Sequence, residues 1–438
     1  MLERIFGLKA HGSDVKTELL AGLTTFLTMA YIVAVNPAIL SQAGMPAAGV
    51  AAATCVAAGL GSILMGVIAN YPLALAPGMG LNAYFTFTVV KGMGLPWQTA
   101  LGCVFVSGLI FLALTLVGAR RLIFDAIPRS LFSAVAAGIG LFIAFVGLKD
   151  AGVVVADAGT AVTMGDLSKP EALVAILGLV LTAALLVWRI KAAILIGVLV
   201  ATAAGWALGL VHVQPGAYAP ASLASTALKL DIPAALGLNG RFGAALVEIV
   251  FVFLFVDVFD NVGTLVGVAK KAGLVAEDGS IPRLNRVLAV DAGAAAIGAL
   301  AGTSTTTSYI ESASGVAAGG RTGLTSMTTG VLFLAAAAFA PLAQAIPVAA
   351  TAPALIVVGA LMASNLGEID WSETETAIPA FLTLIGIPLT FSIANGLAFG
   401  IVSAAVLKLA RGRARPADWL LYVLAALFVA RFVWLEAR

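Results

Sequence analysis

The chain has 438 residues, of which 61% are hydrophobic and only 11% are charged, and its mean hydropathy is +1.07. Soluble domains carry about 25% charged residues, so this composition indicates a polytopic membrane protein. The net charge is only +2 and no block of like charges occurs, which excludes nucleic acid as the partner.

Apolar segments of about 20 residues, the length that crosses a bilayer as a helix, follow one another along the chain. The predicted segments are 17–40, 48–69, 73–92, 97–118, 128–147, 170–188, 191–211, 243–268, 284–301, 303–319, 323–342, 347–364, 376–391 and 393–410. A further stretch, 418–435, contains Arg431 and is either another span or a helix in the membrane interface. We therefore predict an all-α membrane protein with about fourteen transmembrane segments.

Basic residues collect before the first segment and after the fourth, sixth, eighth, tenth and fourteenth segments. All these connections share a side with the N-terminus, because every two segments cross the membrane and return. By the positive-inside rule that side is the cytoplasm. We therefore expect a multi-pass protein of the cell (inner) membrane with a cytoplasmic N-terminus.

The chain repeats itself. An Ile-Pro pair opens the fifth segment at 127–128 and another opens the twelfth at 346–347. The two lie an odd number of segments apart, so the second copy enters the membrane in the opposite direction, as in the inverted repeats of secondary transporters. Such repeats predict two broken segments at matching places. The third segment, LALAPGMGLNAYF, and the tenth, AGTSTTTSYIESASGVAAGG, fit, and each is expected to be a short extended stretch followed by a half-helix.

Polar residues interrupt the eighth segment, FVFLFVDVFDNVGTLVG. Asp257, Asp260, Asn261 and Thr264 fall on one helix face. Each carboxylate at the bilayer centre costs about 2.5–3.5 kcal/mol on insertion scales. One such acid can merely tie two helices together. Here Glu311, expected about two turns into one half-helix, and Asn82, near the start of the other, converge with the stripe, which favours a binding site.

Other classes of function fit the sequence less well. An intramembrane enzyme needs a nucleophile with its base or a metal cluster, and the two histidines, His11 and His212, both lie near predicted membrane edges. Neither an H-E-x-x-H motif nor a phosphate-binding G-x-x-x-x-G-K-[ST] loop is present. We therefore expect no enzyme, no metal and no cofactor, and keep a passive channel or uniporter as the alternative to an active transporter.

Four stretches carry a family resemblance: LAPGMGLNAYF, FVDVFDNVGTLVGVA, RLNRVLAVDAG and TSTTTSYIESASGVAAGGRTGL. In them the chain resembles the nucleobase:cation symporters of the type 2 group, in the azaguanine-sensitive branch that carries adenine, guanine and hypoxanthine. The resemblance covers nearly the whole chain. It implies fourteen segments in two inverted sevens and two domains, a core domain that holds the base and a gate domain that often dimerises. On this chain the core domain would comprise 1–120 and 240–343, and the gate domain 121–215 and 344–438.

The resemblance also assigns roles to residues. Asp257 and Glu311 match the acids of the eighth and tenth segments that hydrogen-bond the purine, and Asn82 matches an amide that affects affinity or specificity. The residues expected to bind substrate are Asn82, Asp257, Glu311, Phe26 and Thr307, and those expected to couple or support are Asp260, Asn261 and Asp291.

Five aromatic residues near the two breaks either pack in the core or stack on the base: Phe26, Tyr31, Tyr84, Phe85 and Tyr309. Phe26 is preferred for stacking because it lies in mid-span among small polar residues, in TTFLTMAY.

The substrate branch of the family and the coupling ion are predicted from residues of the expected site. Uracil and xanthine relatives carry an Asn just past the tenth segment, whereas ESASGVAAGG here contains none, which favours purines and leaves uracil or xanthine as the alternative. Sulfate and bicarbonate relatives share the fold, but an anion would need a cation in the site. A buried carboxylate can take up and release a proton with the substrate, so we expect proton symport by an alternating-access, elevator-type mechanism. Na⁺ is the alternative ion, since carboxylates and carbonyls bind both.

Overall fold

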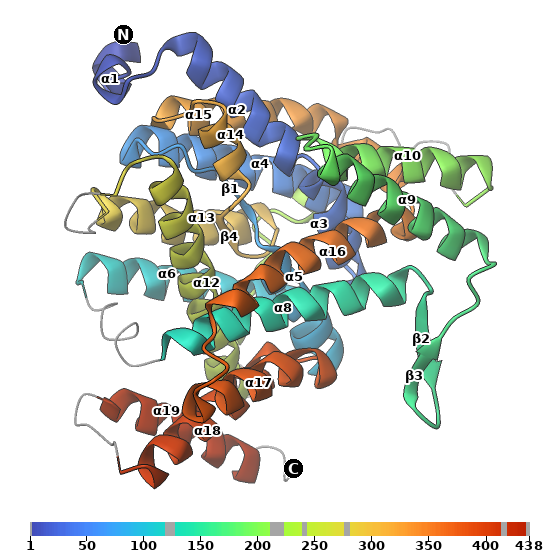
Figure 1. Ribbon diagram of the computed structural model, residues 1–438, viewed down its shortest axis with the longest axis vertical. Coiled ribbons are helices and arrows are strands. Elements are labelled where there is room, and N and C mark those ends of the chain that lie inside the picture. Colours follow the sequence, from blue (N-terminus) through green and yellow to red (C-terminus); the bar gives the residue numbers. More distant parts are fainter. Residues whose placement is uncertain are drawn as a thin grey trace. The chain divides into compact units, whose positions relative to one another are not determined.

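The computed structural model describes residues 2–118, 128–210, 223–238, 243–275, 281–412 and 418–434, which fold mostly into helices (Figure 1). The helices of the first half are α1 (Leu2–Phe6), α2 (Val15–Met29), α3 (Ile32–Leu40), α4 (Ala47–Leu64), α5 (Met79–Ala83), α6 (Trp97–Leu116), α8 (Arg129–Asp150), α9 (Pro170–Val187), α10 (Ala193–Ala207) and α11 (Ile232–Ala235). Those of the second half are α12 (Gly243–Lys271), α13 (Leu284–Ala301), α14 (Ser312–Ala317), α15 (Gly323–Ala336), α16 (Val348–Met362), α17 (Thr374–Leu389), α18 (Ile393–Ala410) and α19 (Trp419–Trp434). The strands are β1 (Leu75–Pro77), β2 (Val154–Asp157), β3 (Ala161–Met164) and β4 (Thr306–Ser308).

The helices agree with the predicted segments. Within the described residues, nine helices are long and apolar enough to cross a membrane, and α10, α17 and α19 are shorter apolar helices. The chain is a polytopic, mostly helical membrane protein. The extended stretches predicted in the third and tenth segments are present as β1 and β4. The count of fourteen spans, their inverted repeat and the role of α19 at the membrane stay predictions.

The hairpin of β2 and β3 was not predicted by hydropathy, because its residues are mostly exposed. Val154 pairs with Met164 and Asp157 pairs with Ala161. The turn is closed by Asp157, whose Oδ1 accepts hydrogen bonds from the backbone N–H groups of Thr160 and Gly159, both at 2.9 Å. These bonds, with that of the Thr160 hydroxyl, hold the pKa of Asp157 below its usual range.

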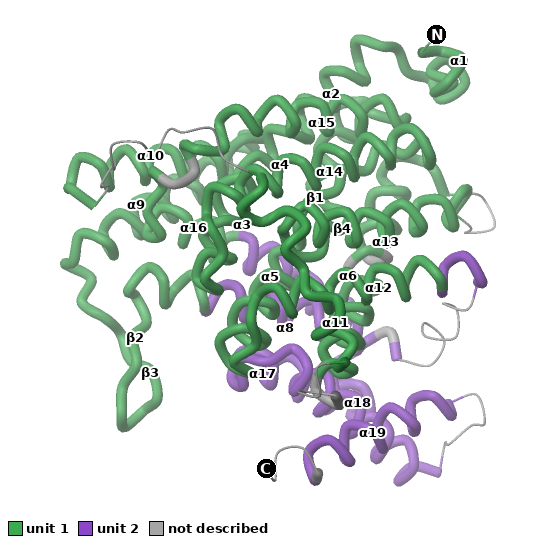
Figure 2. The backbone as a smooth tube through the Cα atoms, turned by 180° about the vertical axis from the view of Figure 1, so that it is seen from behind, with its two compact units in different colours: residues 1–113, 146–357 green, residues 114–145, 358–438 purple. Residues whose placement is uncertain are grey.

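The chain forms two compact units (Figure 2). The first comprises Met1–Ala113 and Val146–Val357, and the second comprises Leu114–Phe145 and Val358–Arg438. The first unit contains all four strands, both broken segments and every residue predicted to bind substrate. The second unit is built on α17 and α18, which pack closely together, and α19 packs on α18.

In the first unit, α15 packs between α2 and α4, and glycines set the closeness of the packing to α4. Gly59 of α4 faces Gly330 of α15, and Gly66, in the π-helical segment Met65–Ala69 that continues α4, faces Gly323 of α15. A Cβ atom on Gly330 would lie 2.5 Å from the carbonyl oxygen of Gly59 and 2.8 Å from Cγ1 of Ile63. Small residues of this kind let membrane helices approach each other at the backbone.

We predict that Gly330→Ala destabilises the protein by about 1–3 kcal/mol, because the added methyl group forces α4 and α15 apart. The matched control is Gly293→Ala in α13, where a Cβ atom would have no neighbour within 4 Å. The control should be neutral or slightly stabilising, since Ala favours the helix over Gly. Thermal unfolding of the purified variants in detergent measures the difference. Equal melting temperatures of Gly330→Ala and Gly293→Ala would contradict a close glycine contact between α4 and α15.

Candidate functional site

The two broken segments meet through their strands. β1 pairs antiparallel with β4, with Leu75 opposite Ser308 and Pro77 opposite Thr306. Backbone hydrogen bonds extend the pairing at both ends, from Gly78 N to Thr305 O at 2.9 Å and from Tyr309 N to Ala74 O at 3.0 Å. Unpaired backbone in a membrane costs several kcal/mol, so each broken segment supplies the partners that the other needs.

Side chains complete the pairing. The Ser62 hydroxyl of α4 accepts from Leu75 N at 2.9 Å and donates to Leu75 O at 3.2 Å. Ser312 Oγ accepts from Ala74 N at 2.9 Å, and the Tyr309 hydroxyl donates to Pro77 O. Pro77 lacks an N–H group, and it lies at the end of β1 where none is needed.

Each strand leads into a half-helix that has a predicted residue within it or directly before it. Asn82 lies in α5, near the start of its half-helix as predicted, and is fully buried. Glu311 directly precedes α14 and is partly exposed. The expectation that Glu311 lies two turns into its half-helix was therefore wrong. The reason is that the strand and the turn after it occupy 306–311, so helix begins only at Ser312.

Tyr31 holds the Glu311 carboxylate. The hydroxyl of this fully buried tyrosine, just after the end of α2, donates a hydrogen bond of 2.9 Å to Glu311 Oε1. A hydrogen bond to a charged group is worth about 1.5–3 kcal/mol. Tyr31 therefore fixes one carboxylate oxygen. The sequence had left this tyrosine open as either packing or stacking.

Asn82 is held in a similar way by an asparagine that the sequence reasoning missed. Asn82 Nδ2 donates to Asn36 Oδ1 of α3 at 2.6 Å. Asn36 Nδ2 in turn donates to Thr54 Oγ1 at 2.6 Å and to Thr303 Oγ1 at 2.8 Å. All four residues are buried. The network orients the Asn82 amide, whose Oδ1 atom accepts no hydrogen bond from the described residues.

The acids of α12 and α13 lie beside β4. Asp257 is buried on α12, which contacts β4, α14 and α5. Ser308 of β4 donates to Asp291 Oδ1 at 2.8 Å and, at 3.4 Å, to Asn261 Oδ1. The predicted polar stripe of α12 therefore faces the strand pair at Asn261. The side chain of Asp260 lies outside the described residues.

Several buried polar atoms near the strand pair have no hydrogen-bond partner within the described part of the chain. They are Asn82 Oδ1, Asn261 Nδ2 and the hydroxyl oxygens of Thr305, Thr306 and Thr307. Buried polar groups are nearly always paired, so a cluster of this kind marks a place where a polar ligand or water can bind. Thr307 is fully buried on β4, as a predicted binding residue should be.

Phe26 packs against the protein. Its ring meets that of Phe333 of α15 edge-to-face, with centroids 5.1 Å apart. This contact favours the packing alternative that the sequence left open, and stacking of Phe26 on a substrate stays a prediction.

Among the residues that the structure describes, no group of three or more His, Cys, Asp or Glu side chains could hold a metal ion.

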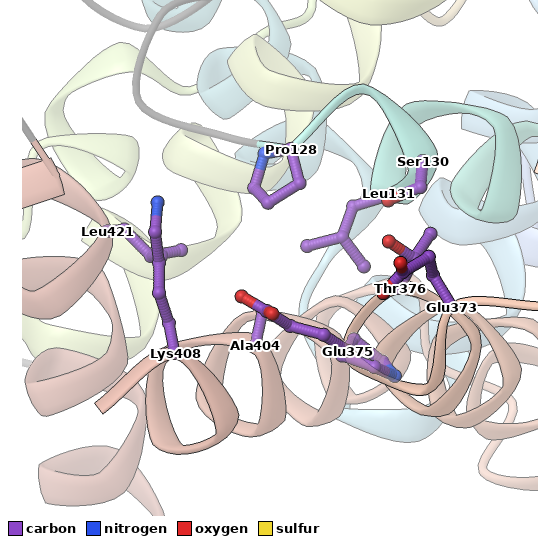
Figure 3. A pocket seen from close by; sticks show the side chains of 10 residues that line it. Pro128, Ser130, Leu131, Glu373, Glu375, Thr376, Ala404, Lys408 and Leu421 are labelled. Atoms are coloured by element: carbon purple, nitrogen blue, oxygen red, sulfur yellow. The ribbon is translucent and has the colours of Figure 1, made fainter. Parts of the chain in front are cut away.

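A pocket of about 340 Å³ lies in the second unit (Figure 3). Its lining includes Glu373, Glu375 and Lys408, and Arg411 pairs with Glu375 at 2.7 Å. None of the residues predicted to bind substrate lines this pocket.

Comparisons with known proteins agree on the class of the chain. The model of the Permease family matches residues 16–399. The chain is 45% identical to the adenine permease AdeP of Escherichia coli, over 100% of this chain and 97% of AdeP. It is 46% identical to the guanine/hypoxanthine permease PbuG of Bacillus subtilis, over 99% of this chain and 100% of PbuG. The transmembrane domain of the cyanobacterial bicarbonate transporter BicA shares the fold, with a TM-score of 0.63, 16% identity, and coverage of 89% of this chain and 97% of that domain.

We predict that Asn36→Ala destabilises the protein by about 1–3 kcal/mol, because it leaves Asn82 Nδ2 without its acceptor in a buried place. The matched control is Asn365→Ala, which removes an amide bonded to one backbone carbonyl, Met362 O, at 2.8 Å. Thermal unfolding in detergent compares the two. A melting temperature of Asn36→Ala no lower than that of the control would contradict the network.

Proposed function

Because the chain belongs to the permease family, whose members are transporters and not enzymes, we propose that it imports purine nucleobases, namely adenine, guanine and hypoxanthine. The names of full-length relatives at 45–46% identity support a purine as the substrate. The observation that carries the proposal is the strand pair of β1 and β4, which leads into α5 with Asn82 and into Glu311 at the start of α14. The absence of the uracil-branch Asn in ESASGVAAGG also favours purines.

The chemistry of the site fits a purine. Along its edges a purine presents both N–H donors and ring-nitrogen acceptors. Tyr31 donates to one oxygen of Glu311, and a carboxylate with its several lone pairs can accept a further N–H group from the base. Asn82 Oδ1 is a second acceptor, and the Thr307 hydroxyl can donate or accept. Asp257 on α12 is proposed to accept a further N–H group of the base, and Phe26 to stack on its ring.

We further propose that transport uses alternating access between a core domain and a gate domain of an inverted repeat. β1 and β4 lie in the two segments predicted to match, and they run antiparallel, as we expect for an inverted repeat. The core would comprise 1–120 and 240–343, and the gate 121–215 and 344–438, with dimerisation through the gate. The N-terminus would lie in the cytoplasm, on the side of the basic connections, and the protein in the inner membrane.

Coupling to protons is proposed for the same carboxylates. Asp260, three residues from Asp257, is proposed to act in coupling rather than in binding the base. Asn261 and Asp291, which both accept a hydrogen bond from Ser308, are proposed as supporting residues. If a carboxylate takes up or releases a proton when the base binds, the proton gradient is coupled to the gradient of the base. Na⁺ in place of the proton, a uracil or xanthine substrate, and passive uniport are the alternatives.

Uptake of labelled hypoxanthine into proteoliposomes at two pH values tests the proposal. We expect an inward proton gradient to drive accumulation, a protonophore to abolish it, and adenine and guanine to compete. Competition by uracil or xanthine without competition by purines would refute the purine branch. Accumulation driven by Na⁺ alone would refute proton coupling, and equilibration without accumulation would indicate a uniporter.

Amide substitutions separate the roles of the acids. Glu311→Gln and Asp257→Asn should each weaken purine binding about tenfold to a hundredfold, since a bond to a charged group is worth about 1.5–3 kcal/mol. Asp260→Asn should retain more binding and lose proton-driven accumulation, because an amide cannot exchange the proton. Equilibrium binding and pH-driven uptake on the purified variants measure both effects. Normal binding by folded Glu311→Gln or Asp257→Asn, or normal accumulation by Asp260→Asn, would contradict the assignment.

A further inference from the structure

A buried carboxylate outside the proposed site lies where α14 joins α15. Glu18 of α2 is fully buried. Its Oε1 accepts from Arg321 N at 2.9 Å, and its Oε2 accepts from Thr322 N at 3.3 Å. Thr325 donates twice more to Oε2, from its backbone N–H at 3.2 Å and from its hydroxyl at 2.5 Å. One side chain therefore receives four hydrogen bonds from the start of α15.

The start of α15 does not need this carboxylate merely to be capped. Thr322 is the N-cap residue, and its own hydroxyl oxygen accepts from Leu324 N at 3.3 Å. Burying a carboxylate is costly unless several donors compensate it. This desolvation cost is explained if Glu18 does something that a local cap cannot do. It fixes the connection between α14 and α15 to α2.

Arg321, in the connection between α14 and α15 (the α14–α15 joint), contacts the end of α14. Its Nη1 donates to Val316 O and to Gly320 O, both at 2.7 Å. These carbonyls belong to the last turn of α14 and to the loop that follows it. The Arg321 side chain therefore caps the end of α14 while its backbone N–H binds Glu18.

The same face of α2 holds the rest of α14. A Cβ atom on Gly315 would overlap Thr25 Oγ1 and lie 2.7 Å from Ala21 O, so the half-helix rests directly on α2. At the other end Tyr31, which follows α2, binds Glu311. The short helix is thus held to α2 at its start, at its middle and, through Glu18 and Arg321, at its end.

We propose that Glu18 and Arg321 are positioning residues for Glu311, and that they keep the carboxylate in place for the base by locking α14 to α2. This rests on the proposed function for the identity of the ligand. Neither residue touches the substrate in this account. With six residues, α14 is too short to hold its own geometry, so its end must be anchored from outside.

Two measurements on purified protein test the proposal: the Kd of hypoxanthine and the amide hydrogen exchange of residues 312–317. The variants are Glu18→Gln, Glu18→Ala and Arg321→Ala. The matched control is Thr329→Ala, which removes a buried 3.0 Å hydrogen bond from α15 to Gly22 O of α2 but leaves the α14 joint intact.

Glu18→Ala and Arg321→Ala should speed the exchange of 312–317 and raise the Kd about tenfold, since a displacement of about 1 Å of a binding group can cost up to ~100-fold. Glu18→Gln, which keeps one acceptor oxygen, should be intermediate. In a Glu311→Gln background these changes should add little to the Kd, because they act through that carboxylate. The control should change the melting temperature without changing Kd or exchange.

Three outcomes would overturn the proposal. The first is unchanged exchange at 312–317 in folded Glu18 and Arg321 variants. The second is a Kd equal to that of the parent in those variants, and the third is an undiminished Kd effect in the Glu311→Gln background. If the Glu18 variants do not fold, Arg321→Ala decides alone, as its side chain contacts backbone carbonyls at a partly exposed place. A parent that binds no purine, while exchange responds as expected, would refute the proposed function and leave the anchoring of α14 standing.

Discussion

The structure depends on one constraint: inside a membrane, backbone groups that leave a helix must find partners within the protein. Leu75–Pro77 and Thr306–Ser308 both leave the helical path, and they satisfy each other as an antiparallel pair. Neither stretch would be stable alone. Their pairing fixes where α5 and α14 begin, and with them Asn82 and Glu311. The proposed binding site is therefore a direct result of how the two breaks solve their hydrogen-bonding problem.

The polar side chains around the pair follow a common scheme, in which a second residue holds the predicted one. Tyr31 holds Glu311, and Asn36 holds Asn82. Ser308 joins Asp291 to Asn261 across β4. Networks of this kind are strong in a medium of low dielectric constant, and the same medium penalises every group left unpaired. A ligand that forms hydrogen bonds with the remaining unpaired atoms removes this penalty, so the site favours a molecule that has both donors and acceptors.

Much of this could be predicted from the sequence, because hydropathy, Gly-Pro breaks and intramembrane acids are local signals. The segments and the two extended stretches agree with the structure. The position of Glu311 relative to α14 was missed, since sequence does not say where a polar strand becomes a helix. Tyr31 and Asn36 were also missed as partners. Tyr31 lies 280 positions from Glu311, and nothing local distinguishes a tyrosine that binds an acid from one that packs. Glu18 lies in the amphipathic start of α2, where an acid is ordinarily an exposed helix-terminal charge.

These contacts also bear on how the site can open. Glu311 is tied to α2 by Tyr31, and α2 to the α14–α15 joint by Glu18. Helix α15 is locked to α4 through facing glycines, which leave no side-chain layer in which the helices could slide. Ser62 then ties α4 to β1, so the series of contacts ends at the strand pair, next to where it began. Because these elements are fixed to one another by a series of short contacts, rearrangement of one of them alone would break several contacts at once. Movement of the assembly as one body would keep these contacts, and a motion of this kind is what the proposed elevator-type mechanism requires.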